Sequence, residues 1–149
     1  MASSVIFTDV ELFLAHHIKD RLDAIAAGPP GLHQALAADV YVGNQHPPTR
    51  RPKSVVVRDD GGPTTGIVTA QTSAGFTVLA GDDDNPGKEA TDLALLVAAI
   101  VAGSPGTEPG NPVAAVLTMN GPFKVADPSG QPRRYFTASL AVTGEEFTL

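Results

Sequence analysis

Hydrophobic positions near the start of the chain recur at the spacing of a helix. The stripe consists of Val10, Leu14, Ile18, Leu22 and Ile25. Intervals of three and four residues place side chains on one helical face. The segment Thr8-Asp-Val-Glu11 matches a capping box, in which each polar side chain satisfies a backbone N–H at the start of the helix. Because Gly and Pro fill positions 28–31, we predict a helix from about Thr8 to Ala27.

The middle of the chain alternates short β-branched runs with turn residues. The predicted strands are Asp39–Gly43, Ser54–Arg58, Gly66–Gln71 and Gly75–Ala80. The segment Asp59-Asp-Gly-Gly-Pro63 has the composition of a turn. Consecutive short strands joined by short turns favour antiparallel pairing.

A second helical stripe follows. It consists of Leu93, Leu96, Val97, Ile100 and Val101. Asn85 followed by Pro86 is typical of a helix start. The acidic run Asp82, Asp83 and Asp84 then lies beside the positive end of the helix dipole, where negative charge is favoured. Gly103 and Pro105 end this helix.

The last third of the chain predicts two more strands, at Val113–Met119 and at the alternating run that begins with Phe136. Between them, Asp127-Pro-Ser-Gly130 is typical of a type I turn. The order of elements predicts one α+β domain over residues 1–149. We expect a two-layer sandwich, in which two amphipathic helices cover one face of a mainly antiparallel sheet. The long connections leave room for a mixed or parallel pairing.

Composition narrows the functional classes. The 149 residues are 42% hydrophobic, which is enough for one packed core. Ten basic and 16 acidic residues give a formal charge of −6, which is unlike a protein that grips DNA by its phosphates. The absence of cysteine excludes disulfides and thiol catalysis. No secretion signal is visible, and the most apolar run is about half the length of a membrane span, so we expect a soluble protein.

Candidate catalytic and metal-binding patterns are weak. Neighbours His16 and His17 diverge by about 100° around a helix, and neither they nor His33 and His46 belong to a metal-binding motif. The acidic run lacks the spacing of a calcium loop. Phosphate-binding loops and nucleophile elbows are missing. We therefore expect no enzyme activity, cofactor or metal.

Clusters of charge remain to be explained. They are either ordinary solvated loop charge or arginine forks that pair with carboxylates of a neighbouring subunit in a ring. On the second interpretation, the candidate interface residues are Arg50, Arg51, Lys53, Asp59, Asp60, Gly61, Gly62, Asp82, Asp83, Asp84, Arg133 and Arg134.

Four segments together resemble a known family. They are Val5-Ile-Phe-Thr-Asp-Val-Glu11, residues 51–62, residues 89–97 and residues 121–135. Over nearly its full length the chain resembles the tail terminator proteins of long-tailed bacteriophages, especially those of actinobacterial hosts. The family is held together by pattern and size, and no single motif is diagnostic.

The resemblance implies a small α+β subunit that is not an enzyme and needs no cofactor. Such subunits assemble as a ring, commonly a hexamer, at the head-proximal end of the tail tube and stop its polymerisation. The implied partners are copies of the chain, the tail tube protein and head-completion or neck proteins. DNA passes through the lumen without specific binding, and no membrane is involved. The implied location is the virion tail or neck, and the host cytoplasm during assembly.

Two elements are the expected contacts with these partners: a hairpin at Asp59–Thr65 and the loop Gly103–Pro112. The nearest alternative function is another neck component, such as a head-closure or adaptor protein. A different class of alternative is a small cytosolic ligand-binding domain.

Overall fold

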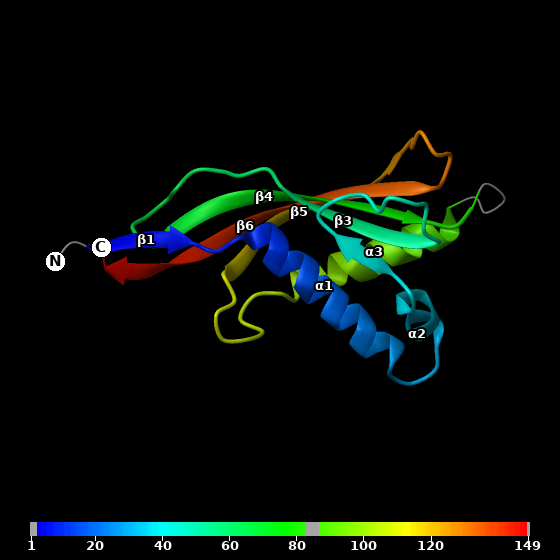
Figure 1. The fold of residues 1–149 in the computed structure, drawn as a ribbon, viewed down its shortest axis with the longest axis horizontal. Coiled ribbons are helices and arrows are strands. Elements are labelled where there is room, and N and C mark those ends of the chain that lie inside the picture. Colours follow the sequence, from blue (N-terminus) through cyan, green and yellow to red (C-terminus); the bar gives the residue numbers. More distant parts are fainter. Residues whose placement is uncertain (1–2, 83–86, 149) are drawn as a thin grey trace.

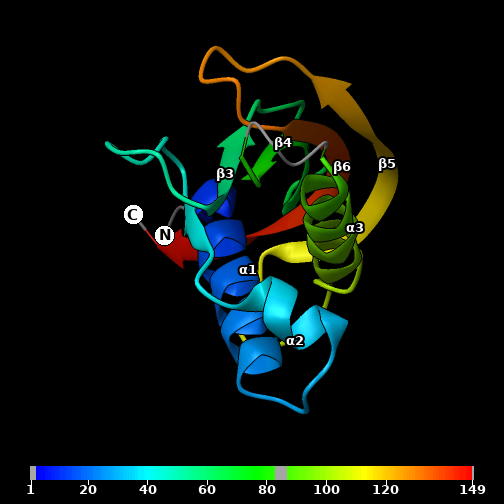
Figure 2. The ribbon, with the colours of Figure 1, turned by 90° about the vertical axis from the view of Figure 1, so that its right-hand side faces the viewer.

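The chain forms one curled mixed sheet with helices on one side, as shown by a computed structural model that describes residues 3–82 and 87–148. The strands are β1 (Ser3–Phe7), β2 (Tyr41–Gly43), β3 (Lys53–Asp59), β4 (Thr69–Ala80), β5 (Val113–Val125) and β6 (Arg133–Thr148). The helices are α1 (Val10–Ala26), α2 (Leu32–Ala37) and α3 (Lys88–Ala102). Figures 1 and 2 show α1 and α3 inside the curl of the sheet, with α2 against their ends. The predicted α+β class is confirmed.

Strand β6 organises the sheet. Its first part, Arg133–Thr143, pairs antiparallel with β4, and it also pairs antiparallel with β5. Its last part pairs with β1, from Phe7 opposite Gly144 to Ser3 opposite Thr148. Strand β3 continues the sheet beyond β4, and β2 joins β3 in parallel. The sheet is therefore mixed, as the long connections allowed.

Every second residue of a strand points to the inner face of the sheet, which the helices cover, and most of these residues are apolar. In β6, Phe136, Ala138, Leu140 and Val142 are all buried, which confirms the predicted alternation. Phe76 of β4 stacks on Phe136, with ring centroids 4.6 Å apart. Both α1 and α3 send their predicted apolar stripes into this core.

Helix α1 confirms the first predicted helix but not its capping box. The side chain that caps it is Asp9, whose Oδ1 accepts a hydrogen bond from the Leu12 N–H at 2.9 Å. Glu11 instead accepts a hydrogen bond from the backbone N–H of Asp59, at 2.8 Å. The reciprocal pattern with Thr8 was wrong because the Glu11 carboxylate serves as a link between α1 and the end of β3.

Other boundaries also differ from the predictions. The strands predicted at Gly66–Gln71 and Gly75–Ala80 form one strand, β4, with no turn at Thr72–Ala74. Strands β5 and β6 run further than predicted, and β1 and α2 were not predicted. The turn at Asp127–Gly130 is confirmed, because the Gly130 N–H donates to the Asp127 carbonyl at 2.9 Å.

The start of the second predicted helix falls partly outside the described residues. Asn85 and Pro86 lie there, as do Asp83 and Asp84. Within the described residues α3 begins at Lys88, and its N-cap is Gly87, which has a left-handed φ of 95°. A Cβ at this glycine would lie 2.4 Å from an Arg134 guanidinium nitrogen, so the Arg134 side chain packs directly on the helix start.

Candidate functional site

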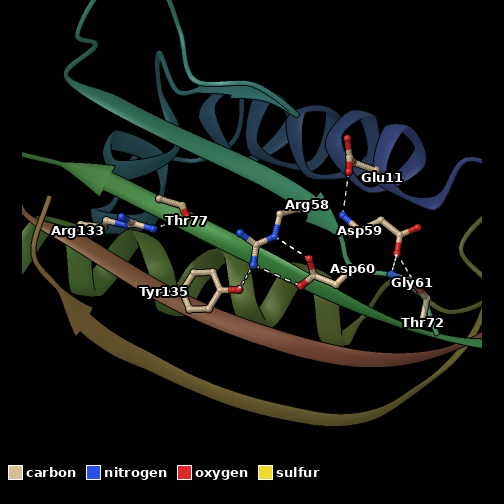
Figure 3. Close-up of polar contacts among 9 residues, drawn as sticks. All are labelled: Glu11, Arg58, Asp59, Asp60, Gly61, Thr72, Thr77, Arg133 and Tyr135. Atoms are coloured by element: carbon tan, nitrogen blue, oxygen red, sulfur yellow. Dashed lines mark hydrogen bonds and ion pairs between the residues drawn. The ribbon is translucent and has the colours of Figure 1, made fainter. Parts of the chain in front are cut away.

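A polar cluster crosses three strands on the outer face of the sheet, the face opposite the helices (Figure 3). Arg58 of β3 donates from Nε to Asp60 Oδ1 at 2.7 Å and from a terminal nitrogen to the Tyr135 hydroxyl at 3.0 Å. The hydrogen bond to Asp60 is the main cause that raises the pKa of Arg58. Asp60 thus has an arginine partner within its own chain.

Gly75 of β4 provides the seat for Tyr135. A Cβ at this position would lie 2.3 Å from the Tyr135 hydroxyl oxygen, so the ring lies over the bare backbone of the neighbouring strand. Across the sheet, Gly75 is opposite both Arg58 and Thr137. The register therefore places the tyrosine hydroxyl beside the guanidinium of Arg58.

The Asp59 side chain accepts hydrogen bonds from groups close to it in the fold. Its Oδ1 accepts from the Gly61 N–H at 2.8 Å and from the Thr72 hydroxyl. Its backbone N–H donates to Glu11, as described above. These contacts fix the end of β3 against both α1 and β4, so the Asp59 carboxylate shapes the chain where it leaves the strand.

The hairpin lies further along the chain than predicted. Residues 60–64 still run beside β4, since Asp60 N–H donates to Ser73 O at 2.7 Å and Gln71 N–H donates to Pro63 O at 2.8 Å. Gly62 packs so closely that a Cβ would lie 2.1 Å from Gln71 O. The reversal occurs at residues 65–69, where Thr65 N–H donates to Thr69 O at 3.0 Å. The expected tip at residues 59–65 was therefore wrong.

The predicted basic residues divide between internal and surface roles. Lys53 donates to the carbonyls of Ala35 and Leu36 at 3.1 and 3.0 Å, which satisfies the C-terminal end of α2. Arg51 lies over the Tyr41 ring, 5.7 Å from its centroid, and Arg50 donates to Ser129 O at 3.5 Å. Both arginines remain exposed.

Arg134 is buried and serves the fold. Its guanidinium donates to the Thr91 hydroxyl at 3.0 Å and to the Gly87 carbonyl at 3.3 Å, both at the start of α3. Arg133 points to the outer face, where it lies 3.8 Å from Asp127 and 3.4 Å from the Thr77 hydroxyl. The sequence predicted one role for both arginines. They have different roles because adjacent residues of a strand point to opposite faces.

The structure brings one group of the predicted residues to the same end of the sheet. Gln131 joins the loop before β3 to the turn before β6, because its side-chain amide donates to the carbonyls of Arg51 and Gly81 at 2.9 and 3.0 Å. Arg50, Arg51 and Arg133 therefore lie at this end, which we call the basic end. Asp82 lines a hollow there together with Lys124 and Arg133.

Exposed apolar side chains form two patches. The β5 patch consists of Phe123 and Val125, which are 54% and 37% exposed. The terminal patch consists of Ile6, Ile67, Val68 and Phe147, which are 58%, 86%, 37% and 41% exposed. The segments that carry them, the end of β5 for the first and β1 with the end of β6 for the second, lie at opposite ends of the sheet (Figure 1).

The pairing register fixes where these patches lie. Phe123 is opposite Tyr135 and Val125 is opposite Arg133, near the start of β6. In the terminal patch, Ile6 is opposite Glu145, two pairs away from Phe147, and Val68 O accepts from the Gly144 N–H at 2.8 Å. From Tyr135 to Phe147 the strand advances twelve residues, or about 40 Å at roughly 3.3 Å per residue. One chain cannot bring its two patches together.

The charges beside the patches have opposite signs. Arg133 lies opposite Val125 on the face of the β5 patch, whereas Glu145 lies opposite Ile6 in the terminal patch and is exposed. Asp127 offsets part of the positive charge at the basic end. Burial alone would raise the pKa of Asp127, but hydrogen bonds from Ser129 and the charges of Arg133 and His46 outweigh it and keep the pKa below its usual value.

Residues 3–82 and 87–148 lack two features that would indicate other functional classes. No group of three or more His, Asp or Glu side chains in this part of the chain is placed to hold a metal ion. None of its helices combines the length and apolar character needed to cross a bilayer. No protein-family model matches the chain, and no curated protein matches it.

Proposed function

We propose that this chain is a structural subunit of a phage tail, which caps the head-proximal end of the tail tube as a ring and ends its polymerisation. The proposal takes its biological setting from the sequence resemblance to tail terminator proteins. Its physical support is the pair of separated patches, because a subunit whose two ends differ and complement each other associates head to tail. Such heterologous contacts close into a ring when the rotation between neighbours allows it.

The complementarity of the two ends carries the proposal. Apolar side chains are exposed at both ends, with Arg133 beside the β5 patch and Glu145 within the terminal patch. Burial of apolar area would supply affinity, and opposite charges would set the orientation and disfavour like ends meeting. The net charge of −6 also suits a lumen through which DNA passes without being held.

The decisive experiment adds the purified chain to polymerising tube protein and images the products. We expect tubes with a ring at one end and lengths that shorten as the chain is added. Overlong tubes in particles that lack the chain would support the same role. Normal free tails beside leaking heads would instead favour a head-closure or adaptor protein of the neck.

A pair of variants tests whether the patches carry the assembly. Phe123→Glu places a charge in the β5 patch, and we expect it to lower ring occupancy on tubes at least ten-fold. Leu95→Glu is the matched control, because Leu95 is 52% exposed on α3, outside both patches. A charge exchange, Arg133→Glu with Glu145→Lys, should restore part of what either single change removes. Equal ring formation by Phe123→Glu and Leu95→Glu would contradict the head-to-tail arrangement.

A further inference from the structure

A second concave surface lies on the helix side, away from both patches. It is a groove of about 620 Å³ between the C-terminal halves of α1 and α3, the connection at residues 28–31, and α2. This volume is within the range of small-molecule sites, which are usually apolar with a few polar groups. The walls fit that description: Ile25, Leu32 and Ile100 supply apolar surface, and Pro29 and Pro30 form the outer wall.

The polar side chains that line the groove are cationic or neutral. They are His17, Arg21, His33, Gln34 and Thr107, and no lining residue is an aspartate or glutamate. In a chain with six more acidic than basic residues, a concave surface lined by an arginine and two histidines stands out. Arg21 offers a planar fork of donors that matches a carboxylate.

His17 is the polar group at the base of this groove. Its side chain is only 4% exposed, and its ring stacks on Phe13 with centroids 5.7 Å apart. The nearest carboxylate oxygen, on Glu108, is 3.7 Å from Nδ1, which is too far for a hydrogen bond. A side chain this buried normally has a hydrogen-bond partner. The partner that the described residues offer His17 is the Glu108 carboxylate, whose side chain is 54% exposed, and a guest carboxylate beside His17 would take its place.

Carbonyls at the helix ends near the groove are already engaged. Gln34 donates to Ala26 O at 3.0 Å, and the Ser104 hydroxyl donates to Val101 O at 2.7 Å. These hydrogen bonds offset the negative ends of the α1 and α3 dipoles. Among the residues that line the groove, Arg21 is the one with a permanent charge.

We propose that this groove binds a small amphipathic carboxylate, with its acid group on Arg21 and beside His17 and its apolar body against Ile25, Leu32 and Ile100. This inference goes beyond the proposed function. The groove and the two patches are on different surfaces, so binding in the groove and ring formation can be tested separately.

Octanoate is a suitable probe, with octanol as the uncharged molecule of the same chain length. Titration calorimetry measures affinity, and imidazole NMR follows His17. We expect octanoate to bind saturably and at least ten-fold more tightly than octanol. Burial, and after it the charge of Arg21, lower the pKa of free His17, whereas Glu108 and Asp20 act in the opposite direction. A bound carboxylate should raise the His17 pKa, and octanol should not.

Three variants locate the site. Arg21→Gln should weaken octanoate binding about ten-fold or more, since it removes the charged fork. Ala99→Trp should abolish binding by filling the groove from an exposed position of α3. Arg51→Gln removes an arginine at the basic end and should bind as the parent does. Three results would each overturn the proposal: no saturable binding of octanoate, equal affinity for octanol, or parental affinity in both Arg21→Gln and Ala99→Trp.

Discussion

The two faces of the sheet are built from the same strands, but apolar packing dominates one and hydrogen bonds between polar side chains dominate the other. On the inner face, Phe76, Phe136 and Leu140 are fully buried against the helices, and packing determines each residue. On the outer face, Arg58, Asp60 and Tyr135 form directed hydrogen bonds across strands, in contact with solvent. Burial of one face is therefore what stabilises this sheet, and the other face and its ends remain exposed to solvent.

The largest expected difference between the two faces is in the cost of the same substitution, Phe→Ala, made on each. Phe76→Ala removes a fully buried ring from its stack with Phe136 and should cost about 3–5 kcal/mol of unfolding free energy. Phe123→Ala, on the half-exposed outer edge, should cost less than about 1 kcal/mol. Urea unfolding monitored by circular dichroism measures both. Similar losses in the two variants would show that the outer edge is packed as tightly as the core.

Acid should affect the helix layer and the outer face at different pH. The pKa of His17 is lowered in the fold by burial and by Arg21. The unfolded chain therefore takes up a proton first, so stability contributed by neutral His17 is present above about pH 6.5 and is lost as pH falls through the folded pKa. The pKa of Asp127 is also lowered, so its contribution is lost only below its ordinary value of 3.8.

Unfolding curves between pH 8 and pH 3 test this separation. His17→Gln should flatten the upper part of the stability profile, and Asp127→Asn should flatten the lower part. His33→Gln is the control for the upper part, because His33 lines the same groove but is exposed. If His33→Gln flattens the profile as much as His17→Gln does, the buried histidine is not its source.

The smallest expected effect concerns the cross-strand cluster. Arg58 and the Tyr135 hydroxyl are joined by a 3.0 Å hydrogen bond at an exposed position, where such contacts contribute little. A double-mutant cycle of Arg58→Gln and Tyr135→Phe should give a coupling energy below about 1 kcal/mol. A coupling of several kcal/mol would mean that the outer face also carries the fold.

The sequence predicted those parts of the fold where one interaction dominates. The apolar stripes of α1 and α3 and the alternation in β6 each reflect burial against a single layer, so periodicity was sufficient to find them. Strand β4 was predicted as two strands joined tightly around Thr72–Ala74. In the structure they belong to a central strand, where Gly75 makes room for the Tyr135 ring.

The candidate site was harder to predict, because the roles of its charges depend on contacts distant in sequence. Lys53 and Arg134 were expected at an interface but satisfy the ends of α2 and α3. Glu11 was expected to cap its own helix but accepts from Asp59, 48 residues away. Neither patch was foreseen, since exposed apolar residues in strands look like core residues until the register is known. The groove was missed because α2 was not predicted.

The central position of β6 also bears on how the molecule folds. Every described element precedes this strand in the chain, yet β1, β4 and β5 all need it as a neighbour. As the polypeptide emerges from the ribosome, the first strand waits for nearly the whole chain before Ser3 can meet Thr148. Contacts of such long sequence separation slow folding. A nascent chain of this protein therefore carries unpaired strand edges until β6 has been synthesised, which is when a chaperone would matter most.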